Sequence, residues 1–313
     1  MLSPCVRILN LDNSLSGHKQ LLEQYHPQVI DLIDLGRQAR LWLNQNTAHQ
    51  FRKLLNPNLK NSITFLGSGD FHHLSSFLIE QFEEPLSVVI FDLHPDWDTG
   101  FPKLGCGSWV SRILEKKNVL KVILLGVSSG DISSFSIQTG NLKSFKNNRL
   151  EIFPYAHRPT RVFFKHVAQN ISLAQKRGLF FTDLYWQELR MRNLKEFIAQ
   201  IIGRLPSEQV YVSIDKDCLT KSHALTNWEE GFFQLDGLLT ILQLIKEKLQ
   251  IIGLDIVGDY SQPLFSSAIK NFFSRLDHPK NFTAKDKAQA QINAVNEKTN
   301  LELLKTLTNG YSR

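Results

Sequence analysis

Five short apolar runs, each stopping abruptly at a polar or glycine-containing turn, constrain the fold of this chain more than any other feature of its sequence. The runs are rich in β-branched and other apolar residues and have the length of single strands. Runs of this kind are typical of strands buried in a parallel sheet. The five predicted strands are residues 63–66, 86–91, 121–126, 209–214 and 250–257.

Helical patterns lie between these runs. Apolar residues recur at helical spacing in 74–82, and the clearest patterns cover 183–204 and 235–249. Strand and helix therefore alternate through the middle of the chain, which predicts a doubly wound α/β fold with a mainly parallel sheet. We expect the polar segment 141–148 to form a loop, and 285–308 to form a charged C-terminal helix outside the main repeat.

Length and composition fit one globular domain. The chain has 313 residues, of which 42% are hydrophobic and 21% are charged, and this is enough for a substantial core. Because no internal linker is evident, we expect a single domain over 1–313. Segments at about 1–60 and about 264–313 are expected to extend its core.

Cysteine usage and the lack of long apolar segments bear on location. Cys5, Cys106 and Cys218 are widely spaced, and none has a C-x-x-C or C-x-x-H zinc spacing, which favours a reducing compartment. The sequence does not open with a basic region followed by an apolar run, and no stretch approaches the roughly 18 apolar residues of a membrane span. We therefore expect a cytoplasmic protein without a membrane partner.

The chain is basic, with a formal net charge of +6 at pH 7 and a pI of about 9.1. Its Lys and Arg residues are nevertheless spread along the sequence without a basic stripe interleaved with aromatics. We expect no nucleic-acid partner and a small-molecule substrate, and a homo-oligomer is compatible with the sequence.

Potential metal ligands follow the strand 86–91 directly. In open α/β sheets, ligands bind outside the carboxyl ends of the strands. Asp92, His94 and Asp96 alternate along the chain here, and residues two apart in extended chain point to the same side. Carboxylates and neutral imidazole suit manganese, zinc or iron, and dinuclear hydrolytic sites are commonly built with bridging carboxylates.

A second pair of carboxylates follows the strand 209–214. Asp215 and Asp217 share a face there, and Lys216 is expected to point away from it. Burying two carboxylates at the end of an apolar strand costs several kcal/mol per ion unless a cation or hydrogen bonds compensate. A bound metal would remove that penalty.

A third cluster follows the strand 63–66. Small residues in 67–69 permit a tight turn, and two histidines, His72 and His73, fall near a helix start. One of them is expected to be a metal ligand. The other histidine or Asp70 could then fix the orientation of its imidazole.

Each cluster alone is a weak signal, because a carboxylate after a strand is more often a helix cap or a turn residue. Three clusters after three apolar strands of one α/β pattern need a common cause. A shared metal site supplies it.

Together the clusters resemble the ureohydrolase superfamily of arginases, agmatinases and formimidoylglutamases, over about 63–259. Arginases have the forms G-G-D-H-S, D-A-H-x-D and S-x-D-x-D, and only the first departs here, by one inserted residue. A less-studied arginase-like branch has G-S-G-[ND]-[YF]-H, then D-x-H-x-D and C-G-S-W. This chain is more similar to that branch, which places the ligand at His72.

The resemblance implies a three-layer α/β/α fold and two divalent ions, expected to be manganese, with a bridging water that attacks a trigonal carbon bearing nitrogen. Asp92 and Asp215 would bridge the two ions. His72 and Asp96 would complete one ion, and His94 and Asp217 the other.

Two departures from the family pattern bear on the substrate. Cys106 stands where arginases and agmatinases have a proton-shuttling histidine, and Gly258 where members that cleave guanidinium groups have a substrate-holding glutamate. Both departures argue against arginine or agmatine as substrate. We take Asp96, Cys106 and Asp259, which follows Gly258, as candidate catalytic residues. Cys106 could be a reactive thiolate, a buried core residue or a substrate contact.

Other residues are open candidates for the site. His157 and His223 could transfer protons, although an isolated loop histidine is more often solvated. Trp97, Trp109 and Trp228 could be pocket aromatics or core residues.

The leading hypothesis is a dinuclear-metal hydrolase of a C–N bond in a linear amidine, guanidino or amide compound. One alternative is a zinc deacetylase, which keeps a single metal and fewer acidic ligands. The other is a non-catalytic arginase-like protein that binds metal or a metabolite.

Overall fold

The computed structural model describes residues 5–55, 61–265, 270–272 and 282–308. The start of the chain and parts of the two expected extensions lie outside the described residues: 1–4, 56–60, 266–269, 273–281 and 309–313.

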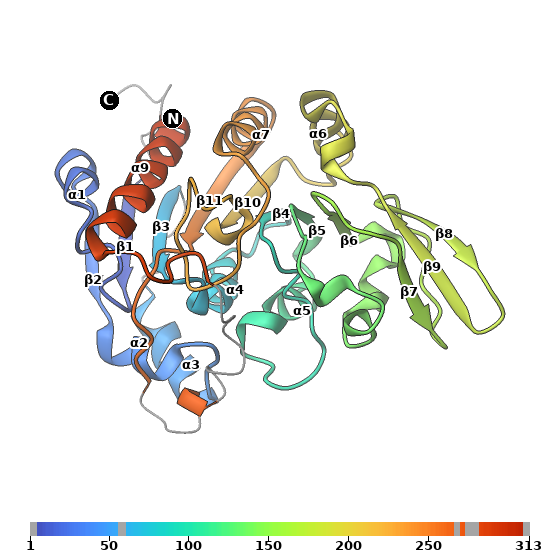
Figure 1. The fold of residues 1–313 in the computed structure, drawn as a ribbon, viewed down its shortest axis with the longest axis horizontal. Helices are drawn as coiled ribbons and strands as arrows, with labels where there is room; N and C mark the ends of the chain where they lie inside the picture. The colour runs from blue at the N-terminus through green and yellow to red at the C-terminus, as the bar shows by residue number, and fades with distance from the viewer. Residues whose placement is uncertain (1–4, 56–60, 266–269, 273–281, 309–313) are drawn as a thin grey trace.

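An eight-stranded sheet forms the centre of the molecule (Figure 1). Every pair of neighbouring strands in it is parallel. From edge to edge the strands are β2 (Gln28–Asp31), β1 (Cys5–Asn10), β3 (Ser62–Gly67), β11 (Gln250–Val257), β10 (Gln209–Asp215), β4 (Leu86–Phe91), β5 (Val119–Leu125) and β6 (Leu150–Phe153).

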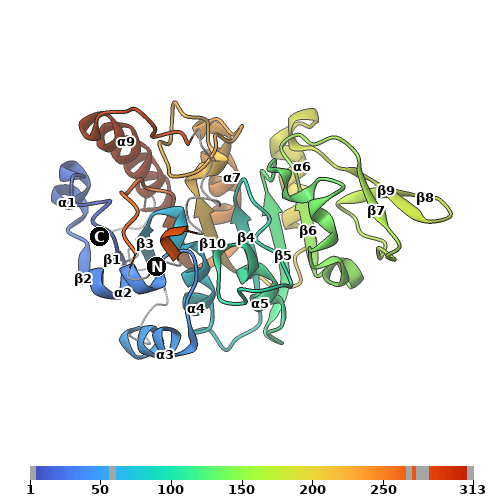
Figure 2. The same ribbon diagram turned by 60° about the horizontal axis from the view of Figure 1, so that its bottom comes forward.

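Helices cover both faces of this sheet, so the chain has a three-layer α/β/α fold (Figure 2). One apolar cluster joins one face to α2 (Ile33–Ala39), α3 (Gln45–Leu54), α4 (Ser75–Ile79) and α5 (Trp109–Leu114). A second cluster joins the other face to α1 (Lys19–Tyr25), α6 (Leu194–Ile202), α7 (Leu235–Lys248) and α9 (Gln289–Thr308). Among the described helices, none combines the length and apolar character needed to cross a membrane.

The two-sided core explains the apolar runs of the sequence. Val88 and Ile90 of β4 belong to one apolar cluster, and Val89 and Phe91 belong to the other. Both faces of the strand are therefore buried, so its sequence is apolar on both faces rather than alternately apolar and polar. The five strands predicted from such runs are confirmed as β3, β4, β5, β10 and β11, all in the parallel sheet.

The helical predictions are confirmed in part. Helix α7 matches 235–249, α9 occupies most of 285–308, and α4 forms within 74–82. The segment 141–148, expected to be a loop, contains 3₁₀ turns over Leu142–Asn148.

The prediction of one helix over 183–204 is wrong, because β9 (Phe181–Trp186) occupies its start and α6 only its end. Thr182, Leu184 and Trp186 are buried, whereas the residues between them are more exposed. This alternation has the period of a strand with one covered face.

The strand β9 belongs to a second sheet, which the sequence did not predict. This sheet is antiparallel and has the order β7 (Thr160–Phe163), β9, β8 (Leu173–Arg177). It extends away from the main sheet beyond β6, at the right of Figure 1. We call it the arm.

The segment before residue 61, expected to extend the core, contributes two strands to the main sheet. Strand β1 pairs with β3 on one side and with β2 on the other. Helix α9 packs against α7 and α1 and buries Leu303, Leu304 and Leu307.

Candidate metal centre

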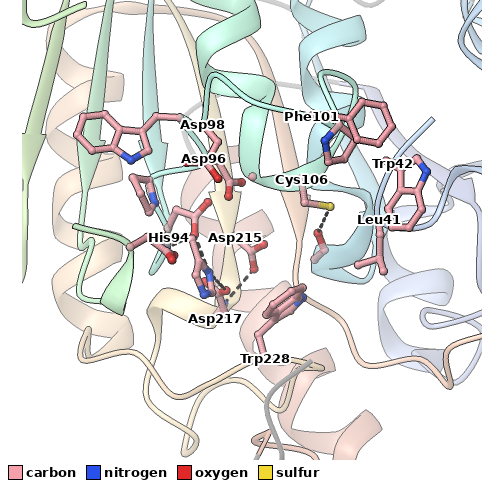
Figure 3. Close-up of a pocket in the computed structure, with 17 residues that line it drawn as sticks. Leu41, Trp42, His94, Asp96, Asp98, Phe101, Cys106, Asp215, Asp217 and Trp228 are labelled. Atoms are coloured by element: carbon pink, nitrogen blue, oxygen red, sulfur yellow. Dashed lines mark hydrogen bonds and ion pairs between the residues drawn. The ribbon is translucent and has the colours of Figure 1, made fainter. Parts of the chain in front are cut away.

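The predicted ligands gather where β3, β10 and β4 end, at the carboxyl ends of these strands. Figure 3 shows His94, Asp96, Asp215 and Asp217 at this place. Since β3, β11, β10 and β4 are consecutive and parallel, their carboxyl ends open on the same side. The side chains that follow these strands therefore meet although they are far apart in sequence.

The first group contains His72, Asp92 and Asp96. Nδ1 of His72 lies 3.0 Å from Oδ2 of Asp92 and 3.4 Å from Oδ2 of Asp96. All three residues are buried. The three ligand atoms are close enough together to face one cation.

The second group contains Asp92, His94 and Asp217. Nδ1 of His94 lies 2.9 Å from Oδ2 of Asp217 and 3.6 Å from Oδ1 of Asp92. Asp92 therefore belongs to both groups and presents one carboxylate oxygen to each histidine. This is the arrangement expected of a carboxylate between two cations.

Asp215 lies beside the first group. Its Oδ2 is 3.5 Å from Nδ1 of His72, and its Oδ1 accepts a hydrogen bond from the backbone N–H of Asp217. The structure thus brings all six predicted metal ligands to one place. Five of them form the two groups, and Asp215 lies at their edge.

Unsatisfied polar atoms show that this place suits a cation. Within the described part of the chain, Nδ1 of His72 and Oδ2 of Asp92 are buried and make no hydrogen bond of acceptable geometry. Buried polar atoms are nearly always paired, so orphaned ones at a carboxylate cluster indicate a missing partner. A divalent cation bound by oxygen and imidazole would supply it.

The electrostatics of the cluster also favour a bound cation. Burial by itself would lower the pKa of His72, but its contacts with Asp92 and Asp96 raise that pKa well above its ordinary value. Burial and the charge of Asp92 raise the pKa of Asp96 to about 7. When no metal is bound, carboxylates this crowded either retain protons or pair with protonated histidines. A bound cation would displace those protons.

The orientation of His72 comes from a buried chain of hydrogen bonds. Nε2 of His72 lies 2.9 Å from Oγ of Ser213, which donates to Oδ1 of Asp255 at 2.7 Å. Asp255 also accepts from Tyr211 and Ser75. Ser213, rather than His73 or Asp70, therefore directs Nδ1 of His72 at the carboxylates.

Sequence reasoning missed Ser213 and Asp255, although one signal was available. Asp255 is a carboxylate inside the apolar run 250–257, where it is fully buried. A buried acid in such a strand must have partners, and here the partners form the support of His72.

Asp96 is held in an unusual backbone conformation. Its φ of 45° lies in the left-handed region, which residues other than glycine rarely adopt. Its Oδ2 accepts a hydrogen bond of 2.8 Å from Nε1 of the buried Trp109. The turn after β4, rather than a regular strand, brings this carboxylate to the site.

Two glycines let the backbone approach the ligands closely. A Cβ at Gly69 would lie 2.8 Å from Oδ2 of Asp215. A Cβ at Gly258 would lie 2.7 Å from Oδ1 of the same aspartate. Gly258 also has a φ of 92°, which disfavours any side chain. The structure therefore has no room for a glutamate at residue 258.

The candidate metal centre is the floor of a cavity of about 490 Å³. Aromatic and other apolar residues form most of its wall (Figure 3), and the acids Asp98 and Asp131 also line it. The lining residues include Leu41, Trp42, Trp97, Phe101, Pro102, Cys106 and Trp228. A small organic molecule could thus reach the two groups.

Trp228 is fixed at the cavity wall. Its Nε1 donates to Oδ1 of Asp70 at 3.1 Å, and its ring meets that of His94 edge to face. The buried Arg40 donates to the other oxygen of Asp70 at 2.5 Å. The contacts of Asp70 therefore support the cavity wall.

Cys106 lines the cavity, as its predicted role requires. Burial, followed by the charges of Asp96 and Asp70, raises the pKa of its thiol well above the ordinary value. Sγ lies 3.0 Å from the carbonyl oxygen of Asp70 and 3.3 Å from Nδ1 of His73. The side chain is a neutral thiol at neutral pH, and a thiolate nucleophile is not supported.

Asp259 is not brought to the cavity. It is buried, and its Oδ1 accepts a hydrogen bond of 2.6 Å from Nζ of Lys216. Asn300 of α9 contacts both side chains. The geometry thus places Asp259 behind the ligands, where it holds the residue between Asp215 and Asp217.

The two candidate proton-transfer histidines also lie outside the cavity lining. Nδ1 of His157 is 2.7 Å from the carbonyl oxygen of Arg158, and Nε2 of His223 is 3.1 Å from Gln234. Among the tryptophans, Trp97 and Trp228 line the cavity, whereas Trp109 is a buried support of Asp96.

No family model matches the chain. An uncharacterised protein of Thermotoga maritima is 29% identical over 198 residues, which are 63% of this chain and 58% of that protein. The match thus spans less than two thirds of the relative's length.

Comparison with solved structures shows the fold. Similar structures include the arginase of Entamoeba histolytica in complex with L-ornithine, with a TM-score of 0.57, 12% identity and coverage of 99% of both chains. The agmatine ureohydrolase of Thermoplasma volcanium has a TM-score of 0.56 and 11% identity, over 96% of this chain and 87% of that one. The formiminoglutamase of Trypanosoma cruzi with Mn²⁺ has a TM-score of 0.53 and 8% identity, over 97% and 94%. The chain has the arginase-like α/β fold.

Proposed function

We propose that this chain is a metal-dependent hydrolase that cleaves a C–N bond in a linear amidine, guanidino or amide compound. One observation carries the proposal: two groups of metal-ligand side chains share Asp92 at the floor of a cavity. Structures with the same fold include an arginase, an agmatine ureohydrolase and a formiminoglutamase, and one of them contains Mn²⁺.

Two divalent ions, expected to be manganese, would be held by the six residues of the centre. Asp92 and Asp215 would contribute to both ions, and the remaining ligands would be His72 and Asp96 for one ion and His94 and Asp217 for the other. Bound divalent ions lower the pKa of water toward neutrality and so supply a nucleophile at neutral pH.

The residues of the chain would orient the ligands and exclude solvent. Ser213 fixes His72, and Trp109 fixes Asp96, so both reach the centre in defined positions. Trp228 packs against His94 at the cavity wall and would limit the access of water to that ligand. Cys106 would contact the substrate as a neutral thiol.

Two features narrow the range of possible substrates. The backbone at Gly258 leaves no space for a carboxylate that would hold a guanidinium group. Cys106, whose pKa is raised by burial, is a poor proton shuttle at neutral pH. Both features argue against arginine or agmatine as the substrate, and the choice among other amidine, guanidino and amide compounds falls to the assay.

The same features favour a second candidate, a non-catalytic protein that binds metal or a metabolite in this cavity. A single-zinc deacetylase fits less well, because two ligand groups are present where one tetrahedral site would need one.

Ammonia, urea or amine release from a panel of amidine, guanidino and amide compounds by the manganese-loaded chain tests the proposal. Activity should disappear on chelation and in Asp92→Asn, which removes the carboxylate shared by both groups. Asp236→Asn, on the exposed first turn of α7, is the matched control and should leave activity unchanged. Tight metal binding without turnover of any compound would support the non-catalytic candidate instead.

A further inference from the structure

The end of the arm exposes apolar side chains that no function proposed above uses. We define the arm tip as residues 163–166, at and after the end of β7, and residues 176–181, around the turn between β8 and β9. The two segments are adjacent, since the backbone N–H of Phe164 donates to the carbonyl of Phe180 at 3.0 Å and their rings are 6.1 Å apart. Phe164 is 83% exposed, Leu179 87% and Phe180 61%. Solvated side chains of this size gain free energy when another surface covers them.

The arm tip is also positively charged. The sequence contains no Asp or Glu between Phe163 and Thr182, but it contains Lys165, Lys176 and Arg177, all exposed. Arg177 contacts His166 rather than an acid. The nearest carboxylate along β9, Asp183, pairs with Arg161 and also lies opposite Lys176 in the pairing of β8 with β9. The surface thus combines protruding apolar groups with three exposed cations, Lys165, Lys176 and Arg177, beside this single carboxylate.

We propose that the arm tip binds the surface of an anionic lipid bilayer. Aromatic and aliphatic side chains at a protein tip enter the interface between headgroups and acyl chains, and Lys or Arg beside them are attracted to anionic headgroups. Each such cation strengthens binding about 5-fold. The arm extends away from the main sheet, so its end can touch a flat surface without the body obstructing it (Figures 1 and 2).

The composition of the tip favours a bilayer over two other occupants. Single-stranded nucleic acid binds through aromatic faces that stack on bases, but the most exposed apolar residue here, Leu179, has no such face. In a dimer formed through two arm tips, the cations of one copy would face the same cations of the other and repel them. A bilayer accepts aliphatic and aromatic groups alike and supplies the opposite charge.

This proposal differs from the expectation of no membrane partner, which rested on the lack of an apolar span. A peripheral contact needs only a few exposed side chains, and these are separated in the sequence by the whole of β8. They come together only when β7, β8 and β9 pair.

Flotation of the full-length chain with vesicles tests the proposal. Vesicles of phosphatidylcholine with about 30% phosphatidylglycerol should carry the protein upward at low salt, and pure phosphatidylcholine should not. Leu179→Ser/Phe180→Ser should weaken binding at least about 10-fold, because two apolar groups no longer enter the interface. Lys176→Glu/Arg177→Glu should weaken it by about 25-fold or more and remove most of its salt dependence.

Two controls keep the result specific. Lys53→Glu/Lys248→Glu lowers the net charge by the same amount at exposed positions outside the arm and should retain most of the binding. Leu54→Ser removes a half-exposed apolar side chain from α3 and should retain it fully. Circular dichroism of each variant verifies that it is folded.

Several outcomes would overturn the proposal. Failure of the wild-type chain to float with anionic vesicles would overturn it. Equal vesicle binding by the arm-tip variants and by Lys53→Glu/Lys248→Glu would also overturn it. Sedimentation velocity that shows a dimer only with Leu179 and Phe180 intact, without vesicle binding, would assign the tip to a second copy. Binding of a single-stranded oligonucleotide instead of vesicles would assign it to nucleic acid.

Discussion

Nζ of Lys216 donates a hydrogen bond of 2.6 Å to Oδ1 of Asp259, and both side chains are completely buried. Lys216 stands between Asp215 and Asp217, so the ion pair fixes the backbone segment that carries two of the proposed ligands. The side chain of Lys216 points away from the two ligands, as the alternation of side chains in extended chain predicted.

Asp259→Asn should therefore destabilise the fold strongly. Removing one partner of a buried ion pair leaves an uncompensated charge, which costs about 3–5 kcal/mol. Urea denaturation monitored by circular dichroism measures the change in the free energy of unfolding. Glu302→Gln, which breaks an exposed pair with Lys305 on α9, is the control and should change that free energy little. Equal, small effects of both substitutions would show that the buried pair contributes nothing.

The chain should bind two divalent ions. Two ligand groups that share Asp92 offer more donors than one tetrahedral site needs. Elemental analysis after manganese loading, with anomalous scattering from a crystal, counts the ions and places them. One ion or none per chain would refute the dinuclear centre.

Ser213→Ala should weaken manganese binding by about 10- to 100-fold without unfolding the protein, because His72 loses the contact that orients its ring. Isothermal titration of the two proteins gives the ratio of affinities. Ser87→Ala, a buried serine of β4 whose hydroxyl has no hydrogen-bond partner among the described residues, is the matched control. If both variants bind as the wild type does, the buried chain of hydrogen bonds does not support the metal.

Manganese affinity should rise with pH across neutrality. The pKa of His72 is raised by its carboxylate neighbours despite burial, and that of Asp96 is raised to about 7 by burial and by Asp92. Below these pKa values the groups are protonated in the metal-free protein, and a cation must displace the protons, so binding weakens as pH falls. Each released proton changes the affinity by up to about 10-fold per pH unit. Titrations in two buffers of different ionisation enthalpy count the protons, and an affinity that stays constant from about pH 6 to about pH 8 would contradict the prediction.

The manganese-loaded chain should be a poor arginase. It lacks a positioned proton shuttle at Cys106 and has no space for a guanidinium-binding carboxylate at Gly258. Together these losses should lower the rate by about 10³ or more relative to an efficient arginase. Urea release from arginine at about 10 per second or faster would show that other residues replace both functions.

The sequence predicted the five consecutive inner strands of the main sheet, because burial on both faces leaves a continuous apolar run that needs no knowledge of long-range contacts. It did not predict β1, β2 and β6, which lie toward the two edges of that sheet. It predicted the arm poorly. Strand β9 has one exposed face, so its apolar residues also fit helical spacing, and only its pairing with β7 and β8 decides between the two.

The proposed ligands were found for a reason that is only partly correct. The alternation argument assumed extended chain through Asp96, but β4 ends at Phe91 and Asp96 has a positive φ. The turn, not the strand, brings Asp96 to His72. The acid at Asp255 inside an apolar run indicated a buried carboxylate that needs partners, but its pairing with Ser213 depends on the register of β10 and β11 and could not be predicted.

The tight backbone at Gly258 limits how this cavity could change in evolution. A mutation to glutamate there would place a Cβ against both Asp215 and the backbone of Lys216, in a conformation that only glycine adopts readily. The first step would therefore damage the centre before any new substrate contact formed. Descendants of this chain could acquire guanidinium recognition more easily from another wall of the cavity, such as the acids Asp98 and Asp131, than by placing a carboxylate at residue 258.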